Sequence, residues 1–235
     1  MNIKSIFKVH LLILTMLIPL QKVSATEVVT TEHLTIYYPT YSSIDLSLGK
    51  MPVLGDAKVE FSCEAAFTGQ LLNSFSHTNI ADHHVSGGKF YKGYSCRANT
   101  GAFIWGNGKW SFMKKAEFLS KKPNCQMAFC QYLIILNGKQ TPMWKMMRNN
   151  RTIYRALCEK DGRLCLVQSK KVITLTQFVK YLMDSHITNA IYLDMGKGWN
   201  YAWYRNEKGK VQEIFPESKK ASDYKYRTNW ITFFK

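Results

Sequence analysis

The sequence lacks the short motifs by which many enzyme classes are recognised. It has no G-x-S-x-G nucleophile elbow, no P-loop, no H-E-x-x-H zinc motif and no dinucleotide-binding glycine pattern. It also lacks a Cys-x2-Cys pair, and its histidines lie away from its cysteines, so no zinc pattern is present. We therefore expect neither a metal ion nor an organic cofactor.

Long apolar runs are scarce, and the one that exists lies at the start of the chain. Residues 1–25 combine a basic start, the apolar run Val9–Leu20 and the small residues Val23-Ser24-Ala25, a pattern typical of a Sec-type signal peptide. The run is short for a transmembrane helix, and no cysteine follows it for lipid attachment. We expect a secreted or periplasmic domain of residues 26–235 with no stable membrane insertion.

Acidic residues are half as numerous as basic ones, 16 against 32, which gives a formal charge of +16. Removing a leader with three lysines and no acid lowers it to +13. Such a charge attracts anions at long range. For an exported protein the expected partner is a phosphorylated or otherwise anionic glycan or a membrane surface, and not nucleic acid. The alternative is that the lysines only solvate the surface.

Six cysteines are present: Cys63, Cys96, Cys125, Cys130, Cys158 and Cys165. Asp161-Gly162 is a hairpin signal between the last two. If Lys160 and Arg163 close that turn, Cys158 and Cys165 face each other across two strands. A disulfide Cys158–Cys165 is then possible at a non-hydrogen-bonded pair, and two buried thiols are the alternative.

The remaining pattern predicts many short strands and few helices. Asn107-Gly108, Asn137-Gly138 and Asp161-Gly162 indicate hairpins. Thr174 is expected to cap a helix whose apolar face is Leu175, Phe178, Val179, Leu182 and Met183. Residues 79–92 look like a polar, glycine-rich loop. We predict the α+β class: a single domain of mainly antiparallel or mixed twisted sheet with one or two flanking helices.

The most informative stretch is Asn189–Arg205. A short apolar strand ends there at Asp194, and Gly196 and Gly198 follow. A strand end holds a carboxylate rigidly, and glycines let backbone N–H groups approach a ligand. Trp199 and Tyr201 could then offer aromatic surface to a sugar. The alternative is that Asp194 starts a tight turn into a second aromatic-rich strand.

Three further groups of residues are candidates for a site. Glu64 lies in an otherwise apolar segment, and a buried charge needs a partner. The polar loop contains Asp82, His83 and His84. Arg155 lies within an expected strand, where it could hold a phosphate or a carboxylate by a bidentate contact. Structural ion pairs are the alternative for Glu64 and Arg155.

The order of these segments resembles the phosphodiester glycosidase family. The resemblance is carried by AAF at 65–67, SGGK at 86–89, GAFIW at 101–105, YLIILNGK at 132–139, R-x3-R-A-L at 151–157 and AIYLDMGKG at 190–198. Asp194 and Gly196 match the Asp and one glycine of the family's D-G-G-G-S type motif. Met195, Lys197 and Gly198 depart from that motif, and Glu64, Ala65 and Ala66 depart from an N-G-G-F-F type motif that Phe67 matches. The chain is similar to a compact, exported bacterial branch.

The resemblance implies a hydrolase that cleaves a glycosyl-phosphodiester bond of the N-acetylglucosamine-1-phosphodiester type. Asp194 would be the catalytic carboxylate, Glu64 or Asp82 its partner, and His84 an acid or base. The substrate-binding residues would be Arg155, Lys89, Arg97, Gly196, Lys197, Trp199 and Tyr201. The departures leave activity open, so the alternative is a non-catalytic glycan- or polyanion-binding protein on the same fold.

Overall fold

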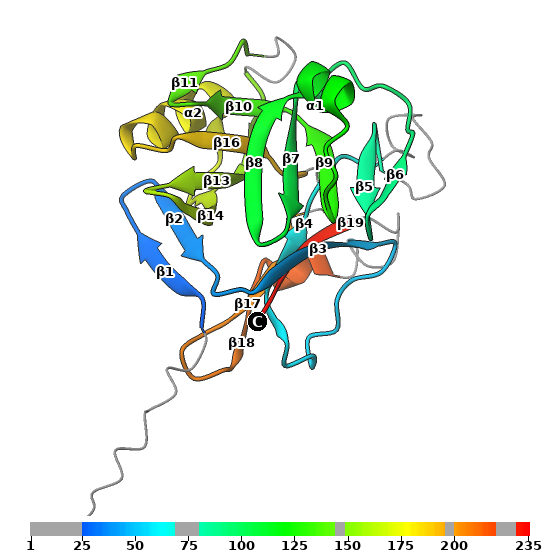
Figure 1. Cartoon of the computed structure of the whole chain (residues 1–235). Helices are drawn as coiled ribbons and strands as arrows, with labels where there is room; N and C mark the ends of the chain where they lie inside the picture. The colour runs from blue at the N-terminus through cyan, green and yellow to red at the C-terminus, as the bar shows by residue number, and fades with distance from the viewer. Residues whose placement is uncertain (1–24, 69–79, 144–148, 196–199, 220–228) are drawn as a thin grey trace, which may run out of the picture.

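The computed structural model describes residues 25–68, 80–143, 149–195, 200–219 and 229–235. In this part of the chain, short strands form three larger sheets, and two α-helices flank them (Figure 1). All strand pairs there are antiparallel. The predicted α+β domain is confirmed. No helix among the described residues is long and apolar enough to cross a membrane.

A seven-stranded sheet has the order β1-β2-β14-β13-β16-β10-β11. Its strands are β1 (Glu27–Thr30), β2 (Leu34–Tyr38), β14 (Arg163–Ser169), β13 (Arg155–Lys160), β16 (Asn189–Tyr192), β10 (Leu133–Leu136) and β11 (Lys139–Gln140). Helix α2 (Leu175–Asp184) covers one face of this sheet with Leu175, Phe178, Val179 and Leu182. A short pair, β12 (Arg151–Thr152) and β15 (Ile173–Thr174), precedes the helix.

Two five-stranded sheets complete the domain. One has the order β18-β17-β4-β19-β3, with β18 (Val211–Ile214), β17 (Ala202–Arg205), β4 (Val59–Glu64), β19 (Asn229–Phe234) and β3 (Ser43–Leu48). The other has the order β6-β5-β9-β7-β8, with β6 (Lys89–Tyr91), β5 (His84–Ser86), β9 (Met127–Gln131), β7 (Gly101–Gly106) and β8 (Lys109–Lys114). Helix α1 (Lys115–Lys121) follows β8, and a 3-10 turn spans Pro216–Ser218.

The central core lies where the three sheets meet. Each sheet contributes large buried side chains to it, for example Leu157 and Ile191, Phe61 and Phe233, and Phe103. Neighbouring residues along the same strands point the other way and form separate clusters beneath α2 and beneath α1. Strand alternation thus lets one strand serve two cores.

Local sequence signals explain the hairpins and the long helix. Asn107, Asn137 and Asp161 have positive φ values of 53°, 51° and 51°, and the glycine after each is also left-handed, as two-residue hairpin turns require. Thr174 accepts a hydrogen bond from the Gln177 amide and completes a capping box with it. The hairpins and the helix are confirmed, but Met183 is 37% exposed and does not belong to the buried face of the helix.

The expected polar loop at residues 79–92 is wrong in part. It contains the hairpin β5–β6, turned by Gly87-Gly88 with φ values of 55° and 75°. The signal was weak because β5 and β6 have three residues each and become a sheet only by pairing with β9, which lies far along the chain.

The cysteine hairpin has the register expected from its turn. Lys160 pairs with Arg163, and Cys158 pairs with Cys165. Because pair types alternate along an antiparallel ladder, Cys158–Cys165 is hydrogen-bonded like the closing pair, and it is not the pair type assumed for a disulfide. All six cysteines are free thiols. Burial raises the pKa of Cys165 to about 12 and that of Cys158 well above the usual range.

We predict that iodoacetamide at pH 8 modifies only Cys96 in the folded protein. The other five thiols are buried, and a raised pKa keeps a thiol protonated and unreactive at that pH. Peptide mass spectrometry measures the modification, and a urea-unfolded sample, in which all six should react, is the control. A peptide in which Cys158 and Cys165 are joined would contradict the prediction.

Candidate functional site

Two carboxylates are brought together where β4 and β16 end. Glu64 is the last residue of β4, and Asp194 follows β16 by two residues. The Asp194 amide donates to the carbonyl of Ala65 at 2.9 Å, which joins the two strand ends. On the other side, the Leu193 amide donates to the Arg155 carbonyl at 3.0 Å. Backbone bonds on both sides therefore hold Leu193 and Asp194 in place.

Asn229 clamps the segment that follows Glu64. Its side-chain oxygen accepts from the Ala66 amide at 2.8 Å, and its side-chain nitrogen donates to the Ala66 carbonyl at 2.9 Å. Its own carbonyl accepts from the Ala65 amide at 3.1 Å. Both alanines are fully buried, so a small side chain suits each position. These bonds fix the backbone next to Glu64 without using its carboxylate.

Tyr192 lies close enough to both carboxylates to feel their charge, and sequence reasoning missed it. Burial, then the Asp194 carboxylate, and more weakly that of Glu64, raise the pKa of Tyr192 well above its usual value. The hydroxyl therefore stays protonated at ordinary pH and can donate, while it accepts from the Met195 amide at 3.2 Å. Its position two residues before Asp194, on the same side of an extended chain, was the available signal.

The surroundings of this group are buried and aromatic. Glu64 is fully buried and Asp194 is 5% exposed. The rings of Phe67 and Tyr154 lie 5.7 and 6.1 Å from the Tyr192 ring. Charges interact more strongly in such an environment than in water. The arrangement can hold or move a proton beside a reacting group.

Arg155 lies in the interior of the protein. Its guanidinium donates twice to the Gln168 side chain, at 3.0 and 2.6 Å, and also to the carbonyls of Asn200 and Tyr201, at 3.0 and 3.5 Å. It also contacts the thiol of Cys63. The side chain is fully buried, so in this geometry it links β13 to the start of β17 and does not face a bound phosphate.

Asp82 and His84 are placed in a different group from Asp194. The Asp82 carboxylate accepts from Lys115 Nζ at 2.7 Å and from the amides of Cys96 and His83 at 3.0 and 2.9 Å. His84 is buried in β5 and stacks on Tyr91 with 5.1 Å between ring centroids. Through these contacts Asp82 anchors the 92–97 segment. The sequence alone could not distinguish this structural role of Asp82 from a catalytic one.

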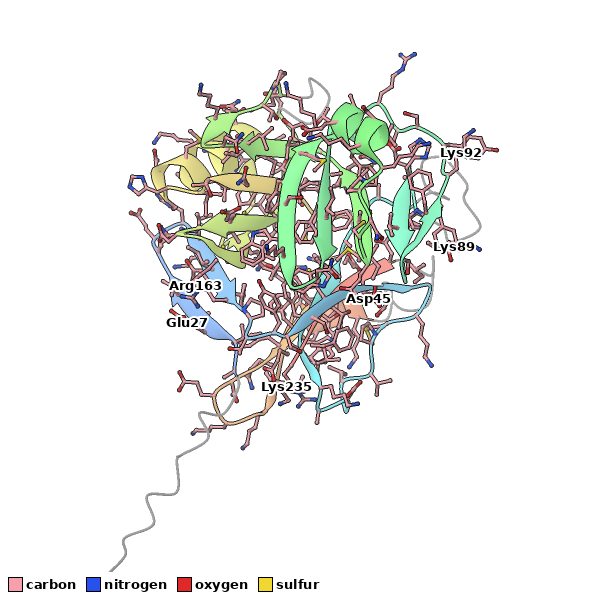
Figure 2. The ribbon with its side chains drawn as sticks, viewed as in Figure 1. Glu27, Asp45, Lys89, Lys92, Arg163 and Lys235 are labelled. Carbon is pink, nitrogen blue, oxygen red and sulfur yellow. The ribbon has the colours of Figure 1, made fainter. Side chains whose placement is uncertain are left out.

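The other expected binding residues fall into three groups: exposed, buried, and outside the described residues. Lys89 and Arg97 are exposed, and Lys89 lies on the outer hairpin β5–β6, 5.4 Å over the Tyr91 ring (Figure 2). Tyr201 is fully buried, donates to Glu213 at 2.5 Å and packs edge-on against Trp230, so no ring face is open to a sugar. Gly196, Lys197 and Trp199 lie outside the described residues. No group of three or more potential metal ligands exists in the described part of the chain.

Comparison with known proteins gives a structural neighbour and no sequence match. No family model matches the sequence, and no curated protein sequence matches it significantly. The structure is similar to the catalytic domain of zebrafish N-acetylglucosamine-1-phosphodiester alpha-N-acetylglucosaminidase, auto-inhibited by its pro-peptide, with a TM-score of 0.55 and 14% identity. The match covers 89% of this chain and 81% of that one. At this identity the likeness shows a distantly related fold.

We predict that Arg155→Met lowers the free energy of unfolding by about 3 kcal/mol, because it leaves the Gln168 oxygen and two carbonyls unpaired in the interior. Urea denaturation measures the change. Arg163→Met on the facing strand is the matched control. That arginine is exposed and paired with Glu27, so its loss should cost less than about 1 kcal/mol. Equal losses for the two variants would contradict the role given to Arg155.

Proposed function

We propose that the protein is a hydrolase that cleaves a glycosyl-phosphodiester bond, with Asp194 and Glu64 as its carboxylates. The observation that carries the proposal is the junction of β4 and β16, where a backbone bond joins the strand ends that bear the two buried acids. Burying two carboxylates costs folding free energy, so their presence at one strand junction favours a chemical role. The activity named for the zebrafish neighbour supports this reaction class.

The reaction would break the bond between the anomeric carbon and the phosphate oxygen. A phosphodiester leaves readily as an anion, so protonation of the leaving group matters less than in ordinary glycosidases. Asp194 would take the proton of the attacking water, whose oxygen bonds to the anomeric carbon, and Glu64 would stabilise the positive charge developing on the sugar ring. The protonated Tyr192 hydroxyl would orient one of the carboxylates or the sugar.

The phosphate would need a cation other than Arg155, whose donors are engaged inside the protein. Lys197 follows Asp194 by three residues and remains our candidate by sequence. The anionic substrate suits the large positive charge of the chain, because such a charge raises the encounter rate with anions.

We predict that the purified protein releases sugar from N-acetylglucosamine phosphodiesters, including a nucleotide sugar, and that Asp194→Asn reduces the rate at least about a hundredfold. NMR follows the released sugar. Asp184→Asn, on the exposed end of α2, is the matched control and should leave the rate unchanged.

Equal release by the parent protein and Asp194→Asn would show that Asp194 is not catalytic. No release from either, while both still bind the sugar, would favour a non-catalytic glycan-binding protein on this fold.

We also propose that residues 1–25 direct export and are removed. Thr26 is 2% exposed, and its amide donates to the Arg205 carbonyl at 3.0 Å. A new terminal ammonium at Thr26 would keep this bond. We therefore expect mass spectrometry of the exported protein to give Thr26 as the first residue. Retention of the leader would contradict export by this route.

A further inference from the structure

One five-stranded sheet and the segments beside it carry many more basic than acidic residues. Between His83 and Gln131, which includes β5 to β9 and α1, the sequence has eight Lys or Arg residues and one acid, Glu117. Glu117 pairs with Lys121, and Lys115 pairs with Asp82. Within the described chain, the other six cations of this segment form no ion pair: Lys89, Lys92, Arg97, Lys109, Lys114 and Lys122.

A cavity of about 470 Å³ opens on this sheet, on the face turned away from the central core. We call it the Phe90 cup. Its lining includes Val85, Phe90, Phe118, Lys122, Asn124 and Cys125. The floor is apolar, because Val85, Phe118 and Cys125 are buried members of the cluster beneath α1. Lys122 supplies a cation and Asn124 an amide, so the cup combines an apolar surface with a few polar groups, as ligand sites do.

The wall of the cup is held in place. Phe90 is 41% exposed, its ring lies 6.3 Å from that of Phe118, and the His83 ring stacks on it at 5.7 Å and 23°. His83 is in turn fixed by the Gly93 amide, which donates to its Nδ1 at 3.2 Å. A Cβ at Gly93 would lie 2.1 Å from the Asp82 carbonyl oxygen, so that close approach requires glycine. An aromatic ring supported in this way is a preorganised contact surface.

Lys122 is the cation in the lining of the cup, and Lys89 and Lys92 lie outside that lining. Lys122 has a left-handed backbone with φ of 40°, and its amide closes α1 by donating to the Phe118 carbonyl. Lys92 follows β6, in the segment tied to His83, and Figure 2 shows it with Lys89 at the outer edge of the molecule beside β5 and β6. A ligand in the cup would therefore meet an apolar ring surface and positive charge together.

We propose that the Phe90 cup binds an acidic pyranose residue of a glycan, separately from the carboxylates at the β4–β16 junction. The C–H face of the sugar would pack on Phe90, and its carboxylate, sulfate or phosphate group would contact Lys122. This site does not depend on hydrolysis. It gives the protein a means of holding an anionic polymer whether or not Asp194 is catalytic.

The test is calorimetric titration of the full chain with a heparin-derived hexasaccharide. Phe90→Ala should weaken binding about fivefold through lost contact area, and Lys122→Gln about tenfold through a lost charged contact. Lys109→Gln, at the start of β8, is the control for charge. Met183→Ala, exposed on α2, is the control for apolar surface. Both controls should bind within about twofold of the parent, since each is a small surface change.

Two further ligands test the class of partner. Maltohexaose, which carries no charge, should bind at least about tenfold more weakly than the acidic hexasaccharide, because it lacks the contact to Lys122. A uridine hexanucleotide of similar length should also bind more weakly than the acidic hexasaccharide. Tighter binding of the nucleotide would overturn the assignment to a glycan.

The proposal is also overturned if Lys109→Gln weakens binding as much as Lys122→Gln, if Phe90→Ala has no effect, or if the hexasaccharide does not bind. Asp194→Asn should bind the hexasaccharide like the parent, which separates this result from any failure of catalysis.

Discussion

The structure depends on one buried guanidinium. Arg155 belongs to the seven-stranded sheet, yet it bonds to the carbonyls of Asn200 and Tyr201, which lead into the neighbouring five-stranded sheet. A charge that is removed from water must be hydrogen-bonded, so this side chain fixes how the two sheets meet. The backbone of the same residue accepts from Leu193, beside Asp194. The position of the candidate catalytic carboxylate is therefore tied to the main cross-link of the core.

Two buried carboxylates, Glu64 and Asp194, lie close to this cross-link. Apolar side chains could fill the β4–β16 junction at lower cost than Glu64 and Asp194, because each buried carboxylate must be stabilised. The protein supplies part of that stabilisation through the backbone and through Tyr192, whose hydroxyl stays protonated. The side-chain bonds of Asn229 to Ala66 and the backbone bonds of Ala65 hold the junction in place. Buried carboxylates on fixed strand ends, beside a protonated hydroxyl, suit proton transfer better than they suit stability alone.

Sequence patterns predicted the elements that depend on local chemistry. Asn-Gly and Asp-Gly turns and the Thr174 cap need only their neighbours, and each was predicted correctly. The pairing of β5 with β9 depends on distant residues, and it was missed. The candidate site residues likewise depend partly on local sequence and partly on contacts between distant residues. A strand end indicated Asp194, but only the fold shows that Asp82 turns to Lys115 and that the Tyr201 ring is covered.

Net charge indicated an anionic partner but could not locate it. A field acts at long range, so any arrangement of the lysines gives a similar attraction to the molecule as a whole. A contact needs a particular cation, and Arg155, the best candidate by sequence, is occupied inside the core. Six cations from Lys89 to Lys122 form no ion pair with another described residue, and they lie on or beside the sheet of β5 to β9. Glu64 and Asp194 lie at the ends of strands in the other two sheets. Capture of an anionic polymer and cleavage of its bond would then be served by different surfaces, and substitutions could weaken one function without changing the other.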